Sequence, residues 1–486
     1  MIVFLKRLIK DGFQRVLKVG LMTLLLVFIS GFWGCDFLEV DPIGKTTIPV
    51  LFSDMDGIQS ALPGAYSAVY EYYDNNFYLY PDVAGDMLSL NVVGGSAEMV
   101  EQYNFSSTPD DAAGTVGHIW RYTYEALANI NNIIEYQPSL VEKYPQYEDQ
   151  LNEILAEALF LRALVHFDVC RCYAQPYNYT EDASHPGVPI VLKTPGPDDN
   201  LPRSSVAEVY DQILKDLDLA IELFEGKVAS TPYYASQEAA YALKARVALY
   251  MENWDDVIAY SDILIGQREL TKREDYTDMF NNLEAGDEMI FRLNGLYKSS
   301  SLSSFYSPIS PVAIPADTLI SLFDDPNDIR LELLTDESNE PVCKKFWITA
   351  EVSEQEKHYD PIVLRLSEVF LNRAEAYLNK QMYEEAANDV KVIQARATGK
   401  DPEDILISYD PVELEKIIDR ERAKELCFEG IRFFDITRRK KDLVREASTT
   451  STVQYIAYPS DLFVLPIPEK ELNANNNITP NPTVND

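Results

Sequence analysis

The sequence predicts a mostly α-helical protein built from packed helix pairs, with loops and short strands inserted among them. Three observations support this prediction: apolar residues recur every three or four positions, helix-start signals precede such runs, and two segments repeat one helix–turn–helix pattern. In residues 153–173, for example, Ile154, Ala158, Leu161 and Val165 follow this period, which places them on one face of a helix.

A second helix is expected to start after Ser205. Ser205 and Glu208 have the spacing of a capping box, in which each side chain accepts a hydrogen bond from the other residue's backbone N–H, and an apolar period follows through residues 206–224. Residues 174–205 are rich in Pro and polar residues and are expected to form a loop. Within this loop "GVPIVL" (187–192) is short and apolar, and we expect it to be extended.

Residues 244–264 and 372–393 look alike. Each is interpreted as a helix, a short turn and a second helix, and each second helix begins with an aromatic residue, Trp254 or Tyr383. In three predicted helices an arginine stands four positions before a residue with a ring side chain: Arg162 before His166, Arg246 before Tyr250, and Arg373 before Tyr377. Small residues in one helix and a large aromatic residue opening its partner are typical of antiparallel pairs such as tetratricopeptide-like repeats.

Between Gly266 and Asp360 the pattern changes. This stretch is rich in Ser, Pro and Asp, and we expect loops with small strands at "EMIFRL" (288–293) and "VCKKFWIT" (342–349). The end of the chain, residues 462–486, is rich in Pro and Asn and is expected to lie extended over the surface.

Residues 418–440 combine apolar positions with a dense run of charges. In this run Glu425, Glu429, Arg432, Asp435 and Arg438 are spaced three or four apart, so a helix would bring opposite charges together as ion pairs. Gly430 is expected to end one helix before another begins, because Gly is unfavourable inside a helix.

Two carboxylates of this run admit a catalytic interpretation. Glu425 and Glu429 could form the acid–base pair that glycoside hydrolysis requires. The arginines nearby would keep both carboxylates ionised, whereas a general acid needs a raised pKa. We therefore favour a salt-bridged helical joint over a catalytic pair.

The N-terminal segment indicates export. Five basic residues precede an apolar run, Leu21–Trp33, of 13 residues, which suits a secretory signal and is shorter than the roughly 20 residues of a membrane-spanning helix. A small residue, Gly34, then precedes Cys35, as in a bacterial lipoprotein signal whose cysteine is acylated. The alternative is an ordinary signal cleaved near Gly34, with an incidental cysteine. Removal of residues 1–34 makes the net charge four units more negative than −36.

Composition excludes several classes of function. A chain with 78 acidic and 42 basic residues repels nucleic-acid phosphates, so a nucleic-acid partner is not expected. The cysteines other than Cys35 are few, and Cys170 and Cys172 point to different faces of one predicted helix, so no disulfide framework is expected. Four His and no metal-ligand spacing predict no metal and no cofactor.

Seven segments, in order, resemble the SusD/RagB family of surface lipoproteins. They are "CDFLEVDP" after the signal, "EALFLRALVHFDVCRCYAQPYN" with "GVPIVL", "RSSVAEVYDQILKDLDLAI", "YYASQEAAYALKARVALYMENWDDVIAYSDIL", "PIVLRLSEVFLNRAEAYLNK", "ERAKELCFEGIRFFDITRR" and "LPIPEKELNANNNITPNP". Together they span nearly the whole chain after residue 34.

The resemblance implies a scaffold of four tetratricopeptide-like helix pairs decorated by loops. It divides the chain into a signal (1–34), an N-terminal SusD-like region (35–265) and a C-terminal region with ligand-side loops (266–486). It further implies a lipid anchor on Cys35, an acidic export signal after it, a position on the outer face of the outer membrane, and a SusC-like TonB-dependent transporter as partner. The implied activity is the non-catalytic capture of oligosaccharide.

Ligand residues are expected on loops where aromatic rings meet amide and carboxylate groups, because sugars present CH faces and hydroxyl edges. Two stretches, residues 66–86 and 292–308, have this composition. Tyr66, Val69, Tyr70 and Tyr73 have helical spacing and are expected in the core, whereas Phe77, Tyr78 and Tyr80 are expected to be exposed. The candidate ligand residues are Asp74, Asn75, Asn76, Phe77, Tyr78, Tyr80, Tyr297, Phe305 and Tyr306.

Two other functions stay open at this point. One is a peptide-binding member of the same family, and the other is a surface glycoside hydrolase. Binding to glycans against peptides separates the first from the main hypothesis, and a turnover assay separates the second.

Overall fold

The computed structural model describes residues 47–92, 97–111, 114–196, 199–227, 231–281, 286–295, 299–347, 359–447 and 449–482. The chain divides into two compact units, residues 1–51 and 52–486. In the first unit the described part is α2 (Ile48–Leu51). The predicted signal, residues 1–34, and Cys35 lie outside the described residues.

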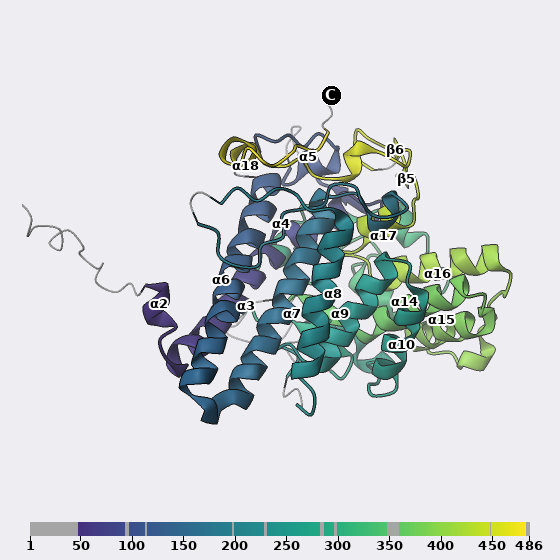
Figure 1. The fold of residues 1–486 in the computed structure, drawn as a ribbon. Coiled ribbons are helices and arrows are strands. Elements are labelled where there is room, and N and C mark those ends of the chain that lie inside the picture. Colours follow the sequence, from purple (N-terminus) through teal and green to yellow (C-terminus); the bar gives the residue numbers. More distant parts are fainter. Residues whose placement is uncertain are drawn as a thin grey trace, which may run out of the picture. The chain divides into compact units, whose positions relative to one another are not determined.

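Residues 52–486 are organised around a row of helices that follow one another along the chain. The members are α3 (Met55–Tyr73), α6 (Thr115–Lys143), α7 (Glu148–Tyr173), α8 (Val206–Leu223), α9 (Gln237–Tyr250), α10 (Trp254–Ile265), α14 (Leu366–Asn379), α15 (Tyr383–Thr398) and α16 (Pro411–Glu425). Each helix packs against the next one in this order, and the colour gradient of Figure 1 runs across the row accordingly. The predicted α-helical class is confirmed.

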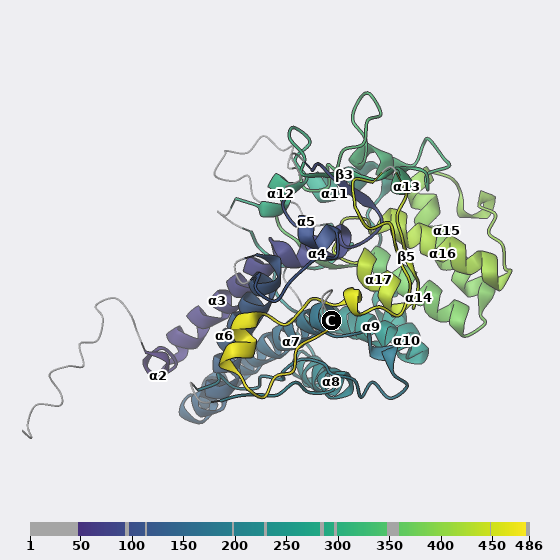
Figure 2. The same cartoon turned by 90° about the horizontal axis from the view of Figure 1, so that it is seen from above.

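Shorter elements connect and cover this row. The remaining α-helices of the described unit are α4 (Asn76–Val83), α5 (Val100–Tyr103), α11 (Tyr276–Asn281), α12 (Ser301–Phe305), α13 (Asp317–Ile320), α17 (Arg432–Arg438) and α18 (Glu469–Ala474). Single 3₁₀ turns are η2 (Pro145–Tyr147), η3 (Tyr177–Tyr179), η4 (Arg273–Asp275), η5 (Ile329–Leu333), η6 (Pro402–Asp404) and η7 (Asp461–Phe463). Seen from above, α11, α12 and α13 lie together with β3, away from α8 and α9 (Figure 2).

The strands of the described residues form three small antiparallel pairs. β1 (Leu88–Leu90) pairs with β3 (Ala313–Pro315), β2 (Met289–Arg292) with β4 (Ile362–Arg365), and β5 (Leu443–Val444) with β6 (Tyr455–Ile456). β2 falls within the predicted strand "EMIFRL". β2 and β4 are fully buried and lie far apart in the sequence. Their pairing joins the region between Gly266 and Asp360 to the start of α14.

Local start signals are confirmed. The Glu208 N–H donates to Ser205 Oγ at 3.2 Å and the Ser205 N–H donates to Glu208 Oε2 at 2.8 Å, which is the predicted capping box at the start of α8. Trp254 and Tyr383 are the first residues of α10 and α15, so both predicted helix pairs exist as α9–α10 and α14–α15.

The recurring arginines each tie one helix of the row to another. Arg162 of α7 binds Asp216 of α8 at 2.6 Å. Arg246 of α9 binds Glu368 of α14, with the Arg246 Nε 2.7 Å from Glu368 Oε1. Arg373 of α14 likewise binds Asp389 of α15 at 2.7 Å and Asp262 of α10 at 2.6 Å. The repeated arginine is therefore a structural device that holds neighbouring helices in register.

The second half of α7 lies at the centre of the core. Every residue from Ala156 to Tyr173 is buried, including His166, which accepts a hydrogen bond from the Val191 N–H at 3.2 Å. Burial, helped by the charge of Arg162, lowers the pKa of His166 to about 3. This histidine is therefore neutral at physiological pH and secures the loop before α8. Cys170, Cys172, Cys343 and Cys427 are buried free thiols.

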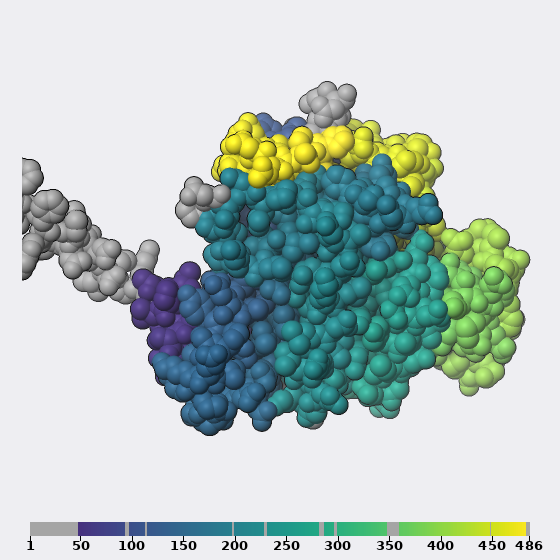
Figure 3. Space-filling model, viewed as in Figure 1, coloured from purple at the N-terminus to yellow at the C-terminus, as the bar shows by residue number. Residues whose placement is uncertain are grey.

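Two local expectations are wrong or incomplete. The described part of "VCKKFWIT", residues 342–347, contains no strand; it lies against the segment between α16 and α17, where Lys345 Nζ donates to Glu429 Oε1 at 2.7 Å. The segment "GVPIVL", expected to be extended, lies in neither a helix nor a regular strand, and the Gly187 N–H donates to the Ser204 carbonyl at 2.7 Å. The C-terminal segment does run over the surface, as the yellow chain in Figure 3 shows, but α18 interrupts its extended course.

No helix within the described ranges is both long and apolar enough to cross a membrane. The apolar run Leu21–Trp33 falls outside those ranges.

Candidate functional site

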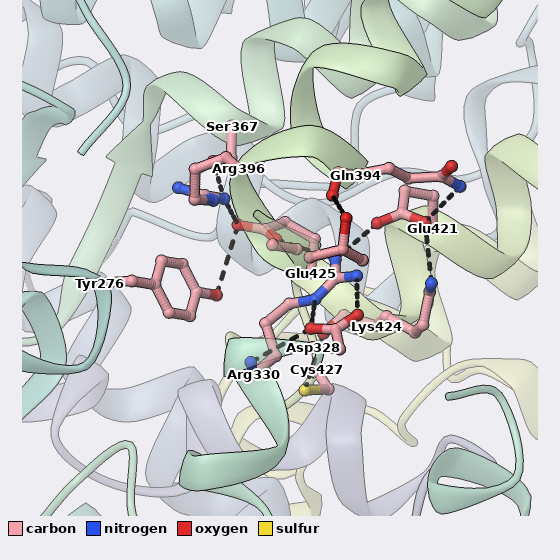
Figure 4. Close-up of polar contacts among 12 residues, drawn as sticks. Tyr276, Asp328, Arg330, Ser367, Gln394, Arg396, Glu421, Lys424, Glu425 and Cys427 are labelled. Carbon is pink, nitrogen blue, oxygen red and sulfur yellow. Dashed lines mark hydrogen bonds and ion pairs between the residues drawn. The ribbon is translucent and has the colours of Figure 1, made fainter. Parts of the chain in front are cut away.

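Glu425 and Glu429 lie in a buried cluster of charges, and this decides between their two interpretations. We call it the buried charge cluster; it comprises Glu288, Asp328, Arg330, Lys345, Arg365, Arg396, Glu421, Glu425 and Glu429. Figure 4 shows Glu425 in the middle of it, with Tyr276, Arg330 and Arg396 converging from separate segments. All of these side chains have almost no exposure to solvent.

The arginines keep Glu425 ionised. Its oxygens lie 2.7 Å from Arg365 Nη1, 2.6 Å from Arg396 Nη2 and 3.1 Å from Arg330 Nη1. Burial alone would raise the pKa of Glu425, but these cations outweigh it and hold the pKa well below 4.5. A general acid must carry a proton at working pH, so Glu425 is unsuited to that role.

Glu429 is ion-paired within the same cluster. It accepts from Lys345 Nζ at 2.7 Å and from Arg365 Nε at 2.7 Å. Only part of the ion-pair pattern expected along residues 418–440 forms locally: Asp435 does bind Arg438 at 2.8 Å, whereas Arg432 binds Asp86 at 2.7 Å and not Glu429. Gly430 has a φ of +69° between α16 and α17, as the predicted helix break requires. The interpretation as a salt-bridged joint is confirmed.

The exposure expected for Phe77, Tyr78 and Tyr80 is wrong. The chain turns at Asp74 and Asn75 and then re-enters a helix, α4, whose rings are only 2–3% exposed. Tyr78 donates to the Ile362 carbonyl at 2.9 Å. Phe77 packs on Tyr72 and Tyr73 of α3, and Tyr80 packs on Phe433 and Phe434 of α17. The rings therefore stabilise the core and offer no flat surface to a sugar.

The rings predicted in the second stretch are also buried. Phe305 and Tyr306 are each 1% exposed, and Tyr306 stacks on Phe346 with centroids 4.9 Å apart and planes 14° apart. Tyr297 lies outside the described residues. The apolar partner Phe346 comes from residues 342–347, which the sequence analysis had assigned to a strand.

Asp74 is a structural cap in the described fold. It is 5% exposed and accepts from Ser300 Oγ at 2.6 Å and from the Ser301 N–H at 2.8 Å, at the start of α12. Burial raises the pKa of Asp74 to about 6, and these donors oppose that rise. The two predicted ligand stretches are therefore joined to each other, through Asp74 and Ser300.

Asn75 and Asn76 are the predicted residues that do reach a cavity. They are half-buried and line an open hollow of about 690 Å³, here called the Asn76 hollow. Its other polar walls include Glu98, Glu101, Asp110, Asp111 and His118. Asn76 Nδ2 donates to Thr115 Oγ1 at 3.1 Å, which fixes the amide against the first turn of α6.

His118 gives this hollow its one ring among the described lining residues. It packs against Tyr122, one helical turn further along α6, with centroids 4.2 Å apart and planes tilted by 45°. Burial, followed by the charge of Arg121, lowers the pKa of His118 to about 4, so the imidazole is neutral at pH 7. His118 was not among the residues predicted from the sequence. It lies one helical turn after Thr115 on α6, and the contact between Asn76 of α4 and Thr115 brings it beside the predicted residues.

A second cavity of about 550 Å³ lies beside α6. It is lined by Trp120, Tyr124, Val191, Leu201, Lys470 and Ala474, among others, and is here called the Trp120 groove. Trp120 and Tyr124 are one helical turn apart, with ring centroids separated by 4.8 Å. No group of His, Cys, Asp and Glu able to hold a metal ion occurs within the described part of the chain.

Comparison with known proteins identifies the family. Residues 36–249 match a family model described as starch-binding and associating with the outer membrane, and residues 335–483 match the model of the SusD family. SusD-like protein P2 of Formosa agariphila is 24% identical over 525 aligned positions, which cover 96% of this chain and 98% of that protein.

Solved structures share the fold. A SusD superfamily protein from Bacteroides thetaiotaomicron superposes with a TM-score of 0.80 at 26% identity, covering 88% of this chain and 100% of that chain. Surface glycan-binding protein A from Bacteroides fluxus superposes with a TM-score of 0.71 at 20% identity, covering 88% and 99%. With both family models in the expected order and the helical row reproduced, this chain belongs to the SusD/RagB family.

Proposed function

We propose that this protein is a cell-surface lipoprotein that captures oligosaccharide and delivers it to a SusC-like TonB-dependent outer-membrane transporter without cleaving it. The observation that carries the binding role is the Asn76 hollow, where three amide residues, a neutral imidazole and several carboxylates surround an open space. Amides and carboxylates form hydrogen bonds with sugar hydroxyls, and a neutral imidazole can both donate and accept. The family description and the relatives' names support the ligand class.

The lining favours a neutral glycan. Glu98, Glu101, Asp110 and Asp111 contribute negative charge around the hollow, in a chain whose net charge is −36. A polyuronate or sulfated polymer would be repelled, whereas a neutral glucan carries no charge to oppose.

The double substitution Asn76→Ala and His118→Ala tests this site. Retention in native affinity gels should be lost or clearly weakened for at least one of the polymers that the unmodified protein retains among soluble starch, laminarin, mannan and xylan. The matched control is Asn129→Ala, an exposed position on the same helix that lines neither cavity. A folded double variant with unchanged retention would refute the Asn76 hollow as the site.

The non-catalytic role has its own test. The purified protein should release no reducing ends from the polymers that it retains, because Glu425 and Glu429 are locked in ion pairs. Measurable turnover would favour a surface glycoside hydrolase, and retention of peptides in place of glycans would favour a peptide-binding member of the family.

The anchor and the partner are tested in cells. Mass spectrometry of the mature protein should find acyl chains on Cys35, and Cys35→Ala should move the protein from the membrane to the soluble fraction, since two or more chains give stable attachment. Protease added to intact cells should digest the unmodified protein if it faces outward. Purification in mild detergent should bring down a TonB-dependent transporter.

A further inference from the structure

We propose that the Trp120 groove is a second saccharide-binding site, separate from the Asn76 hollow. The two cavities lie on opposite sides of α6. His118 and Trp120 are two residues apart, which is a rotation of about 200° around a helix, so a ligand in one cavity does not occupy the other.

Trp120 and Tyr124 form an aromatic floor in the groove, and hydrogen bonds fix the position of both rings. Trp120 Nε1 donates to Glu471 Oε2 at 3.3 Å, and Tyr124 Oη donates to the Pro189 carbonyl at 3.2 Å. The polar atoms of both rings are therefore bonded inside the protein. Trp120 is only 6% exposed, so the half-buried ring of Tyr124 presents most of the aromatic surface of the groove. Apolar ring surfaces are what the CH face of a sugar stacks on.

The walls are held in place by side-chain bonds to the backbone. Asn475 Nδ2 donates to the Leu201 carbonyl at 2.8 Å, and Asn131 Nδ2 donates to the Val191 carbonyl at 2.8 Å. These bonds tie α18 to the loop before α8, and that loop to α6. A cavity formed before the ligand arrives loses little conformational entropy on binding, and its volume of about 550 Å³ lies within the usual range for small-molecule sites.

The rim carries polar groups of both signs. Arg121 and Glu125 are exposed to 59% and 57% and lie 3.8 Å apart, and Lys470 is exposed on α18. Asp199 adds a carboxylate to the lining, whereas the Asn475 amide is used within the protein. Such a rim offers donors and acceptors to hydroxyl groups and has too little net charge to select an ion, so a neutral saccharide fits it better than a charged ligand.

The experiment fills the groove by a substitution on α18 and leaves Trp120 and Tyr124 unchanged. Ala474 is exposed and lines the groove, so Ala474→Trp should fill it, while Asn473→Trp adds the same ring to the adjacent exposed position of α18, outside the groove. The probes are soluble starch, laminarin, mannan and xylan in native affinity gels, with Kd values from calorimetry on their oligosaccharides. We expect Ala474→Trp to weaken binding of at least one saccharide about tenfold or more, and Asn473→Trp to match the unmodified protein.

Other outcomes separate this proposal from the proposed function. The variant with Asn76→Ala and His118→Ala should keep the saccharide binding that depends on residue 474. If that variant retains every polymer normally while Ala474→Trp does not, the groove is supported and the Asn76 hollow is refuted. The groove proposal is overturned if Ala474→Trp, folded by circular dichroism, binds all four polymers like the unmodified protein, if none of them is bound, or if it loses only peptide binding.

Discussion

Arg365 and Glu425 form an ion pair of 2.7 Å with side chains only 1% and 0% exposed. Arg365 ends β4 and Glu425 ends α16, so the pair joins the inserted strands to the closing helices. The same guanidinium also binds Glu288 and Glu429. The cluster therefore acts as one unit, and loss of one member leaves several buried charges uncompensated.

Glu425→Gln should be strongly destabilising. The substitution removes one charge and leaves Arg330, Arg365 and Arg396 buried without it, which costs about 3–5 kcal/mol in free energy of unfolding. Urea denaturation followed by circular dichroism measures this loss. Glu413→Gln is the control, because the Glu413–Lys416 pair is exposed and its loss should change stability little. Equal stability of the two variants would contradict the role of the cluster.

The contribution of Asp82 to the free energy of unfolding should fall as pH rises. Burial raises its pKa to about 8, against the Gly430 N–H that donates to Asp82 Oδ2 at 2.9 Å. The folded state thus holds a proton that the unfolded chain releases near pH 4, so this contribution is complete below pH 4 and is lost as pH rises to about 8. The slope is at most about 1.4 kcal/mol per pH unit. Melting curves from pH 5 to 9 should show a weaker decline for Asp82→Asn; parallel curves would contradict this.

Gly430→Ala and Gly64→Ala should have opposite effects. Gly430 has a φ of +69°, and an added Cβ would meet the Tyr78 carbonyl at 3.1 Å, so alanine there should cost about 1–2 kcal/mol or more. Gly64 is inside α3 with no atom within 4 Å of an added Cβ, so alanine there should stabilise by about 0.5–1 kcal/mol. Thermal unfolding of both variants measures the difference, and a Gly430→Ala variant as stable as the unmodified protein would be unexpected.

The four described thiols should not react in the folded protein. Burial raises the pKa of Cys170 to about 12 and that of Cys427 to about 11, so little thiolate forms at pH 8. A chain that starts at residue 36 should show no reaction with Ellman's reagent in buffer and four reactive thiols in concentrated guanidinium. Fast labelling of any of them without denaturant would mean that the core opens locally.

Charge should exclude uronates from the Asn76 hollow. Glu101→Gln combined with Asp110→Asn removes two of its carboxylates, and we expect alginate to bind this variant better than the unmodified protein while neutral glucan binding changes less. High salt should act in the same direction, because a Debye length of about 3 Å at 1 M screens exposed charges. Equal exclusion of alginate before and after the substitutions would argue against an electrostatic cause.

Much of the fold could be predicted because its signals are local. The Ser205 cap, the aromatic residues that start α10 and α15, and the break at Gly430 depend on residues within a few positions of one another. The repeated arginines were visible as a pattern, but their partners were not. Arg246 binds a carboxylate 122 positions away, and spacing along one helix carries no information about such a partner.

The candidate site was harder to predict, because exposure is not a local property. Phe77, Tyr78 and Tyr80 follow a sequence that looks like a loop, yet Tyr78 bonds to a residue 284 positions away and all three rings are covered. Asn75 and Asn76 remain at the surface of the same turn, and His118 joins them from another helix. The sequence alone determines the helix pairs, the helix starts and the family resemblance, since these depend on neighbouring residues and on residue order. Only the tertiary structure decides which rings are buried and which polar groups share a cavity, because distant segments supply the atoms that cover or expose them.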